Sequence, residues 1–186
     1  MSDNNLRVYS TEKKSRTYSV LVQNEPGVLS RVAGLFSARG YNIVSLAVGE
    51  TLDPAVSRMT IVCDGTEMVL GQIAKQLDKL IPVLDVKSLH EGEFVSRELM
   101  LIKIDKTAKA KKYLQDNWLK HNWQLIDESP EHYIVQITSS REESEAVLAE
   151  LKPFNISEMS RTGQVAMSKK HKIGSEPAPQ PEMRKA

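Results

Sequence analysis

The sequence predicts an α+β protein built from two small domains, each with the element order β-α-β-β-α-β. Apolar and polar side chains alternate from Thr17 to Gln23, as in a strand, and apolar residues then recur at helical spacing from Val28 to Phe36. The same order of elements returns more weakly in the second half, at a period of about eighty residues. This order is typical of the ferredoxin-like arrangement, in which two helices pack on one face of a four-stranded antiparallel sheet. The other face of the sheet is expected to be left uncovered.

Length and composition fit a soluble chain with two small domains. The 186 residues are 40% hydrophobic and 26% charged, and 25 basic against 24 acidic side chains leave a net charge of only +1. A neutral chain has no overall field to attract nucleic acid or acidic membranes. No apolar run approaches the length needed to cross a bilayer, and the polar opening is no secretory signal, so we expect a cytoplasmic protein with no nucleic-acid or membrane partner. Cys63, the single cysteine, is expected to be a buried thiol.

The first domain is expected to span residues 17–90, after a flexible arm over 1–16. Pro26 suits the first position of its first helix, and Gly40 suits the left-handed residue that ends it. A hairpin follows, with strands at 43–49 and 57–63 and a turn at Asp53-Pro54. A second helix carries an apolar stripe from Val69 to Ile81 and is expected to stop at Pro82, before a fourth strand over 83–89.

The start of the first helix is a candidate binding site. A helix N-terminus presents unpaired N–H groups and partial positive charge, which can hold a carboxylate. Gly27 lets a ligand approach that backbone, and the amide of Asn24 can both donate and accept, as a zwitterion requires. On these residues alone, an ordinary capped helix start is the simpler explanation, since proline after a polar turn residue is a routine helix signal.

The second domain is expected to span residues 97–168, after a polar linker over 91–96. Strands are predicted at 98–104, 123–126 and 133–138, and a helix carries Ala110, Tyr113, Leu114 and Trp118 on one face. A capping box at Ser140 predicts a helix to Leu151. A last strand over 155–167 is expected to be interrupted near Gly163. The charged and proline-rich composition of 169–186 predicts a disordered tail.

The sequence lacks the usual signatures of catalysis and metal binding. The four histidines have no ligand spacing, and glycine-rich nucleotide and nucleophile motifs are absent. Glu91 and Glu93 fit a solvated linker better than an acid/base pair, and Trp118 and Trp123 fit the second core better than a stacking site. An RNA-recognition sheet would need aromatic residues on its central strands, and 57–63 has none.

Three stretches together resemble the regulatory small subunit of acetohydroxyacid synthase (acetolactate synthase), a family that begins with an ACT domain. They read Asn-Glu-Pro-Gly-Val-Leu-Ser-Arg-Val from Asn24, Gly-Leu-Phe-Ser-Ala-Arg-Gly-Tyr-Asn-Ile from Gly34, and Ser-Arg-Met-Thr-Ile-Val from Ser57. The resemblance runs in order from about Tyr18 to Leu89 and continues more loosely to about Ser168. It implies two ferredoxin-like domains and a homodimer in which ACT domains join side by side.

The resemblance also implies a function. It implies a non-catalytic subunit that activates a thiamine-diphosphate-dependent large subunit and confers feedback inhibition by a branched-chain amino acid, valine being the first choice among valine, leucine and isoleucine. The chain would hold no cofactor, whereas thiamine diphosphate, Mg²⁺ and FAD would belong to the catalytic partner, whose holoenzyme is a transferase. The implied effector site joins Asn24, Glu25, Pro26, Gly27, Val28 and Leu29 of one chain to Asn42 and Ile43 of the other.

Two questions stay open at this point. The exposed hairpin tip, Glu50, Thr51, Leu52, Asp53 and Pro54, is a candidate contact for the catalytic subunit. The main alternative function is an ACT-domain amino-acid sensor coupled to a different enzyme or regulator. An enzyme in its own right is disfavoured by the missing motifs.

Overall fold

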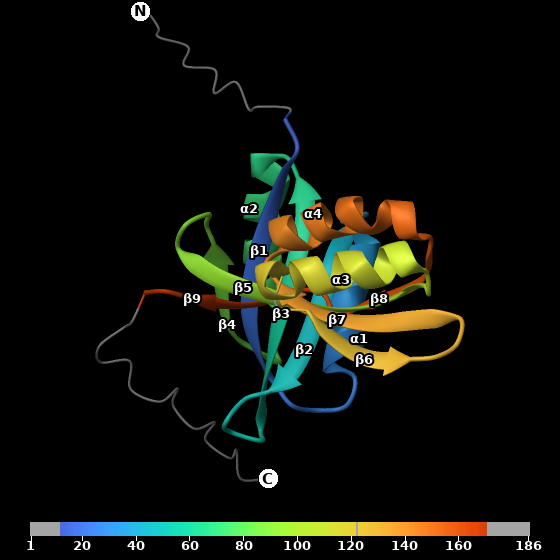
Figure 1. Cartoon of the computed structure of the whole chain (residues 1–186). Helices are drawn as coiled ribbons and strands as arrows, with labels where there is room; N and C mark the ends of the chain where they lie inside the picture. Colours follow the sequence, from blue (N-terminus) through green and yellow to red (C-terminus); the bar gives the residue numbers. More distant parts are fainter. Residues whose placement is uncertain (1–11, 122, 171–186) are drawn as a thin grey trace, which may run out of the picture.

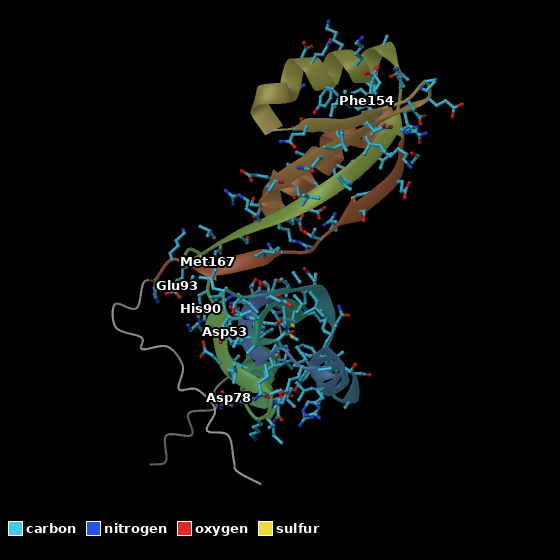
Figure 2. The ribbon with its side chains drawn as sticks, turned by 90° about the horizontal axis from the view of Figure 1, so that it is seen from below. Asp53, Asp78, His90, Glu93, Phe154 and Met167 are labelled. Atoms are coloured by element: carbon cyan, nitrogen blue, oxygen red, sulfur yellow. The ribbon has the colours of Figure 1, made fainter. Side chains whose placement is uncertain are left out.

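The computed structural model describes residues 12–121 and 123–170, and these form two lobes joined by one long strand. Figure 2 shows the lobes one above the other, with the long strand rising from the lower lobe into the upper one. Most of the expected arm and tail, residues 1–11 and 171–186, lies outside the described residues. So do the side chain of Trp118 and residue His171.

The first lobe, residues 14–89, has the predicted β-α-β-β-α-β order. Its four strands pair in the order β2-β3-β1-β4, and every pairing is antiparallel. The elements are β1 Lys14–Gln23, α1 Val28–Ala38, β2 Ile43–Glu50, β3 Val56–Gly65, α2 Glu67–Leu77 and β4 Val83–Leu89. The fourth strand has the bounds that the sequence predicted. The first strand begins three residues earlier than expected, so Lys14 to Arg16 belong to the sheet and not to an arm.

The core of the first lobe lies between the sheet and its two helices. Alternate residues of β1, Tyr18, Val20 and Val22, are fully buried there, as the period of two predicted. The Tyr18 hydroxyl donates to the carbonyl oxygen of Leu70 at 2.7 Å, so this buried polar atom is satisfied. Cys63 is also fully buried, as expected, and burial raises the pKa of its thiol to about 12.

Both helices of the first lobe differ from expectation at one end. Helix α1 begins at Val28, because Gly27 adopts a left-handed φ of 85° that breaks the helical backbone between it and Pro26. Pro26 therefore precedes the helix and does not open it. Gly40, with φ 66°, ends the helix as predicted. Helix α2 ends at Leu77, before the predicted stop at Pro82, because the chain turns at Leu80, whose N–H donates to Leu77.

The second lobe, residues 94–168, repeats the plan of the first and adds one strand. Its sheet order β6-β7-β5-β8 corresponds position by position to β2-β3-β1-β4. Figure 1 shows α3 and α4 side by side on one side of this sheet. The elements are β5 Phe94–Asp105, α3 Ala108–His121, β6 Gln124–Glu128, β7 His132–Ser139, α4 Arg141–Leu151, β8 Ile156–Arg161 and β9 Val165–Ser168. Trp123 is a core residue of this lobe, as predicted.

The two predicted signals near the end of the chain are confirmed. Ser140 and Glu143 form the reciprocal capping box of α4. The last strand is interrupted at Gly163, which has φ 81° and separates β8 from β9. The long strand β5 begins at Phe94, inside the stretch that the sequence assigned to a linker, and only residues 90–93 remain between the lobes' strands.

One expectation about the first lobe is wrong: the second face of its sheet is not left uncovered. Strand β9 pairs with the first part of β5, and this two-stranded ribbon lies against that face. Thr17, Ser19 and Thr60, which point away from the helices, are consequently buried. Alternation from Thr17 to Gln23 places Thr17 and Ser19 on the face opposite Tyr18 and Val20, but it could not reveal which distant segment covers that face.

Candidate functional site

The start of α1 is exposed and carries no side-chain cap. Its N-cap is Gly27, and within the described residues no side chain bonds the first turn and no acidic residue lies in it. The N–H groups of Leu29 and Ser30 have no partner inside the helix, because a helix leaves its first N–H groups unpaired. A hypothetical Cβ on Gly27 would meet nothing within 4 Å, so the backbone here is open to an approaching group. The arrangement suits a carboxylate.

Apolar side chains flank this helix start on two sides. Val28 is buried and supports the turn, whereas Leu29 is 46% exposed despite belonging to the predicted apolar stripe. An exposed leucine beside free N–H groups can offer contact area to an aliphatic side chain. Glu25 and Pro26 are exposed in the turn before the helix, and the carbonyl oxygen of Glu25 accepts from the N–H of Val28 at 3.3 Å.

Asn24 is fastened to the β2–β3 hairpin. Its Nδ2 donates to the carbonyl oxygen of Pro54 at 2.9 Å and to Oε1 of Glu50 at 3.2 Å, and its backbone N–H donates to Ala55 at 2.8 Å. Both side-chain bonds use the amide nitrogen. The amide oxygen thus keeps its capacity to accept from an ammonium group.

Asn42 and Ile43 lie at the opposite end of the same sheet. Ile43 opens β2 opposite Cys63, whereas Asn24 follows the end of β1, where Gln23 lies opposite Val56. Strand β2 spans seven residue steps from Ile43 to Glu50, which corresponds to about 23 Å at ~3.3 Å per residue. One chain therefore cannot bring the two asparagines around a ligand the size of an amino acid. The two groups of predicted residues can meet only between two chains.

The hairpin tip, Glu50 to Pro54, projects beyond the sheet. Leu52 at its end is fully exposed, while the carboxylate of Asp53 accepts from the N–H of Ala55 at 2.9 Å and holds the turn. The side chain of Thr51 also bonds within the turn, to the backbone of Asp53. The tip thus presents one large apolar side chain on a braced loop. Sequence reasoning did not foresee that Glu50 and Pro54 also bond Asn24 of the helix-start site.

Other chemistries find little support in the described residues. Residues 12–121 and 123–170 contain no group of three or more His, Cys, Asp or Glu side chains that could hold a metal ion. In the same part of the chain, no helix is long and apolar enough to cross a bilayer. Glu93 forms an ion pair with Lys170 at 2.5 Å, and that hydrogen bond holds the pKa of its carboxyl below the usual value. This pairing links Glu93, just before β5, to Lys170, just after β9.

Both lobes match known protein families. Residues 18–85 match a family model described as "AHAS small subunit-like ACT domain", and residues 97–170 match one described as "Small subunit of acetolactate synthase". The isozyme 3 small subunits of acetolactate synthase from Salmonella typhimurium and Escherichia coli are each 46% identical over 159 residues, covering 85% of this chain and 98% of the relative.

A solved structure is similar over the same extent. The crystal structure of the acetolactate synthase small subunit from Thermotoga maritima has a TM-score of 0.77 and 36% identity, and covers 85% of this chain and 99% of its own. The probable small subunit from Methanothermobacter thermautotrophicus is 40% identical over 159 residues, covering 85% of this chain. Two lobes that both match, in order and over nearly the full length of these relatives, show that the chain belongs to the acetolactate synthase small subunit family.

Proposed function

We propose that the chain regulates an acetolactate synthase: it binds the catalytic large subunit, raises its activity, and makes that activity sensitive to feedback inhibition by a branched-chain amino acid. The observation that carries the proposal is the uncapped, acid-free start of α1 in a chain of this family. Free N–H groups there take the carboxylate, and the amide oxygen of Asn24 takes the ammonium. The exposed side chain of Leu29 contacts the aliphatic group.

The effector site in this proposal lies between two copies of the chain. A two-fold axis that pairs two first lobes brings the Asn24 end of one sheet to the Asn42 end of the other, and it does so twice. The separation of the two ends by about 23 Å within one chain supports this arrangement, because one chain alone cannot complete the site. Sedimentation at micromolar concentration should give a dimer, and a strict monomer with and without valine would remove the interface site.

The catalytic chemistry belongs to the partner in this proposal. Thiamine diphosphate, Mg²⁺ and FAD are expected there, and this chain supplies the effector site and a docking surface that includes the hairpin tip. The fully exposed Leu52 on a braced turn supports the tip as a contact. The chain would act in the cytoplasm, together with the synthase.

One pair of measurements tests the proposal. Calorimetric titration of the full chain with valine, leucine and isoleucine measures effector binding, and acetolactate production by the large subunit, with and without this chain, measures activation. We expect saturable binding of a branched-chain amino acid and a rise in turnover that the same amino acid reverses. If turnover stays unchanged over a saturating range of the chain, the regulatory proposal is wrong and the alternative of a sensor for another enzyme gains support.

A further inference from the structure

The two lobes are joined by hydrogen bonds from β9 and the residue just before it to hydroxyl groups on the first sheet. The N–H of Gln164 donates to Oγ of Ser45 at 3.0 Å, and the N–H of Ala166 donates to Oγ1 of Thr60 at 3.3 Å. Both bonds thus run from the end of the second lobe to the face of the first sheet that lies away from its helices. Gln164, Ala166 and both hydroxyl-bearing residues are buried. Loss of either acceptor would leave a buried N–H unpaired.

Gly163 brings the second lobe unusually close to Ser45. Its φ of 81° is left-handed, and a Cβ built on it would lie 2.5 Å from Oγ of Ser45, far inside contact distance. Glycine is therefore required here twice, by the backbone conformation and by the close approach. Gly92, between the lobes' strands, has a similar φ of 79°, yet a Cβ there would meet nothing within 4 Å. The same substitution at Gly163 and at Gly92 therefore separates the effect of the close contact from the effect of a strained backbone.

Ser45 lies two residues beyond Ile43, and a β-bulge separates them. Ile43 pairs with Cys63 and Ser45 pairs with Val62, so two steps along β2 correspond to one step along β3. The bulge reverses the alternation of faces. Ile43 consequently packs against the core beside the helices, while the side chain of Ser45 points to the opposite face and meets β9. The segment from Ile43 to Ser45 thus belongs to the candidate effector site on one face of the sheet and contacts the second lobe on the other face.

We infer that Ser45 couples the effector site to the second lobe: an amino acid bound against Asn42 and Ile43 alters the bulge, and the bulge alters the contact of Ser45 with Gly163 and Gln164. This inference rests on the proposed function, because it takes Asn42 and Ile43 as effector residues. The coupling requires only that the effector interact differently with two arrangements of the bulge. The contact is suited to report such a change, because it combines a buried hydrogen bond with a close approach of the Gly163 backbone to Oγ of Ser45.

The central experiment compares Gly163→Ala with its control Gly92→Ala in the full chain. Both variants impose a Cβ on a left-handed backbone, but only Gly163→Ala forces Ser45 away from the second lobe. We expect both to bind valine with a dissociation constant within threefold of wild type. Inhibition of the partner by saturating valine should fall to less than half of the wild-type extent in Gly163→Ala and should be unchanged in Gly92→Ala. Equal inhibition in the two variants would overturn the inference.

A second substitution tests whether the effect passes through Ser45 itself. Ser45→Ala removes the Oγ that accepts from the N–H of Gln164 and leaves Gly163 unchanged. If the coupling passes through Ser45, this variant should lose inhibition as Gly163→Ala does, while its dissociation constant for valine stays within threefold of wild type. Wild-type inhibition in Ser45→Ala would contradict a role for Ser45.

Amide hydrogen exchange tests the coupling in the wild-type chain, so the result does not depend on whether a substituted chain folds. Saturating valine should change the exchange rates of the Gln164 and Ala166 amides at least fivefold, because their acceptors lie on the first lobe. If valine binds and inhibits but both rates stay within twofold, the inference fails while the proposed function stands. If valine neither binds nor inhibits in wild type, the proposed function itself has failed.

Discussion

The first helix of each lobe begins in a different way, although the two lobes share one plan. Helix α3 is capped by Thr107, whose hydroxyl accepts from the N–H of Ala110 at 3.0 Å. Helix α1 begins at a left-handed glycine with no side-chain cap. Relative to a glycine N-cap, a hydroxyl cap of this kind stabilises a helix by only about a few tenths of a kcal/mol, so α1 forgoes a small contribution that its counterpart has. The fold thus tolerates a helix start with or without a side-chain cap, and the first lobe leaves the N–H groups at the start of α1 available.

The remaining two helices follow the pattern of α3. Thr66 caps α2, which has Glu67 in its first turn, and Ser140 caps α4, which has two glutamates in its first turn.

The hairpin tips of the two lobes also differ in what they expose. The first lobe exposes Leu52 at its tip, whereas the second lobe turns at Ser129, whose hydroxyl accepts from the N–H groups of Glu131 and His132. The uncapped helix start and the fully exposed leucine at a hairpin tip thus both belong to the first lobe.

The strongest test of the comparison places a charge at the open helix start. In Gly27→Asp, the new carboxylate competes with that of the effector for the same N–H groups, and like charges at ~4 Å repel by about 1 kcal/mol or more. We expect at least a tenfold loss of valine affinity, which corresponds to about 1.4 kcal/mol, with activation retained. Calorimetry and partner activity are the measurements.

The matched control for this charge is Gly27→Asn. Asparagine has nearly the same shape, accepts left-handed backbone readily, and meets the same open space around Gly27. It should lose less affinity than the aspartate variant, and the difference isolates the charge. A folded Gly27→Asp chain that is still inhibited normally would show that the effector binds elsewhere.

The hairpin tips give the next effect in size. Replacement of the exposed Leu52 by Ser should weaken activation of the partner severalfold and leave valine binding unchanged, because Leu52 is fully exposed while Asn24 bonds Glu50 and Pro54. Asp53 is a poorer choice, since its carboxylate holds the turn. Titration of partner activity against the chain gives the apparent affinity. Parallel loss of activation and valine binding would mean that the tip and the helix start act as one site.

A smaller effect is expected from the capped helix of the second lobe. Ser140→Ala removes one half of the capping box and should lower the free energy of unfolding by about 1 kcal/mol, without altering valine affinity. The measurement is urea unfolding followed by circular dichroism, with calorimetry as the control. Valine affinity that falls along with stability would indicate that the second lobe supports the effector site more directly than proposed.

The same cap predicts a dependence on pH. The N–H of Ser140 bonds the carboxylate of Glu143 and lowers its pKa from the ordinary value of 4.5. A lowered pKa stabilises the folded state above pH 4.5, and this contribution is lost as pH falls through the folded pKa. Glu143→Gln should therefore reduce the acid sensitivity of unfolding below pH 4.5. An unchanged acid transition would exclude a measurable contribution from this group.

The smallest effect concerns Cys63. Burial raises the pKa of its thiol to about 12, so almost no thiolate exists at pH 8, and the thiolate is the reactive form. The native chain should react with a thiol reagent far more slowly than the unfolded chain does. Rapid reaction under native conditions would reveal opening of the first lobe, in which Cys63 is fully buried.

Local patterns in the sequence determined most of the elements of this protein. Alternation predicted β1, the helix stop expected at Pro82 preceded the predicted β4, the capping residues predicted the start of α4, and Gly40 and Gly163 marked breaks where the backbone is left-handed. These signals are reliable because each depends on residues within a few positions of one another. The helix start that we propose as the effector site was likewise suggested by Asn24 followed by Pro26 and Gly27. The proposed division of this site between two chains came from the resemblance, and the separation of its two halves within one chain came from the strand register.

Only the tertiary structure decided how the lobes meet. The bond from Gln164 to Ser45 joins residues 119 positions apart, and neither residue carries a local signal that it will find the other. The outward face of the first sheet read as solvent-exposed because serine and threonine suit water as well as a buried hydrogen bond. Its burial depends on the length of β5. The first part of β5, from Phe94 to Arg97, pairs with β9 and lies against the first sheet, whereas its later part pairs with β7 and β8 in the second lobe. That path follows from packing between distant segments, which periodicity within a strand does not encode.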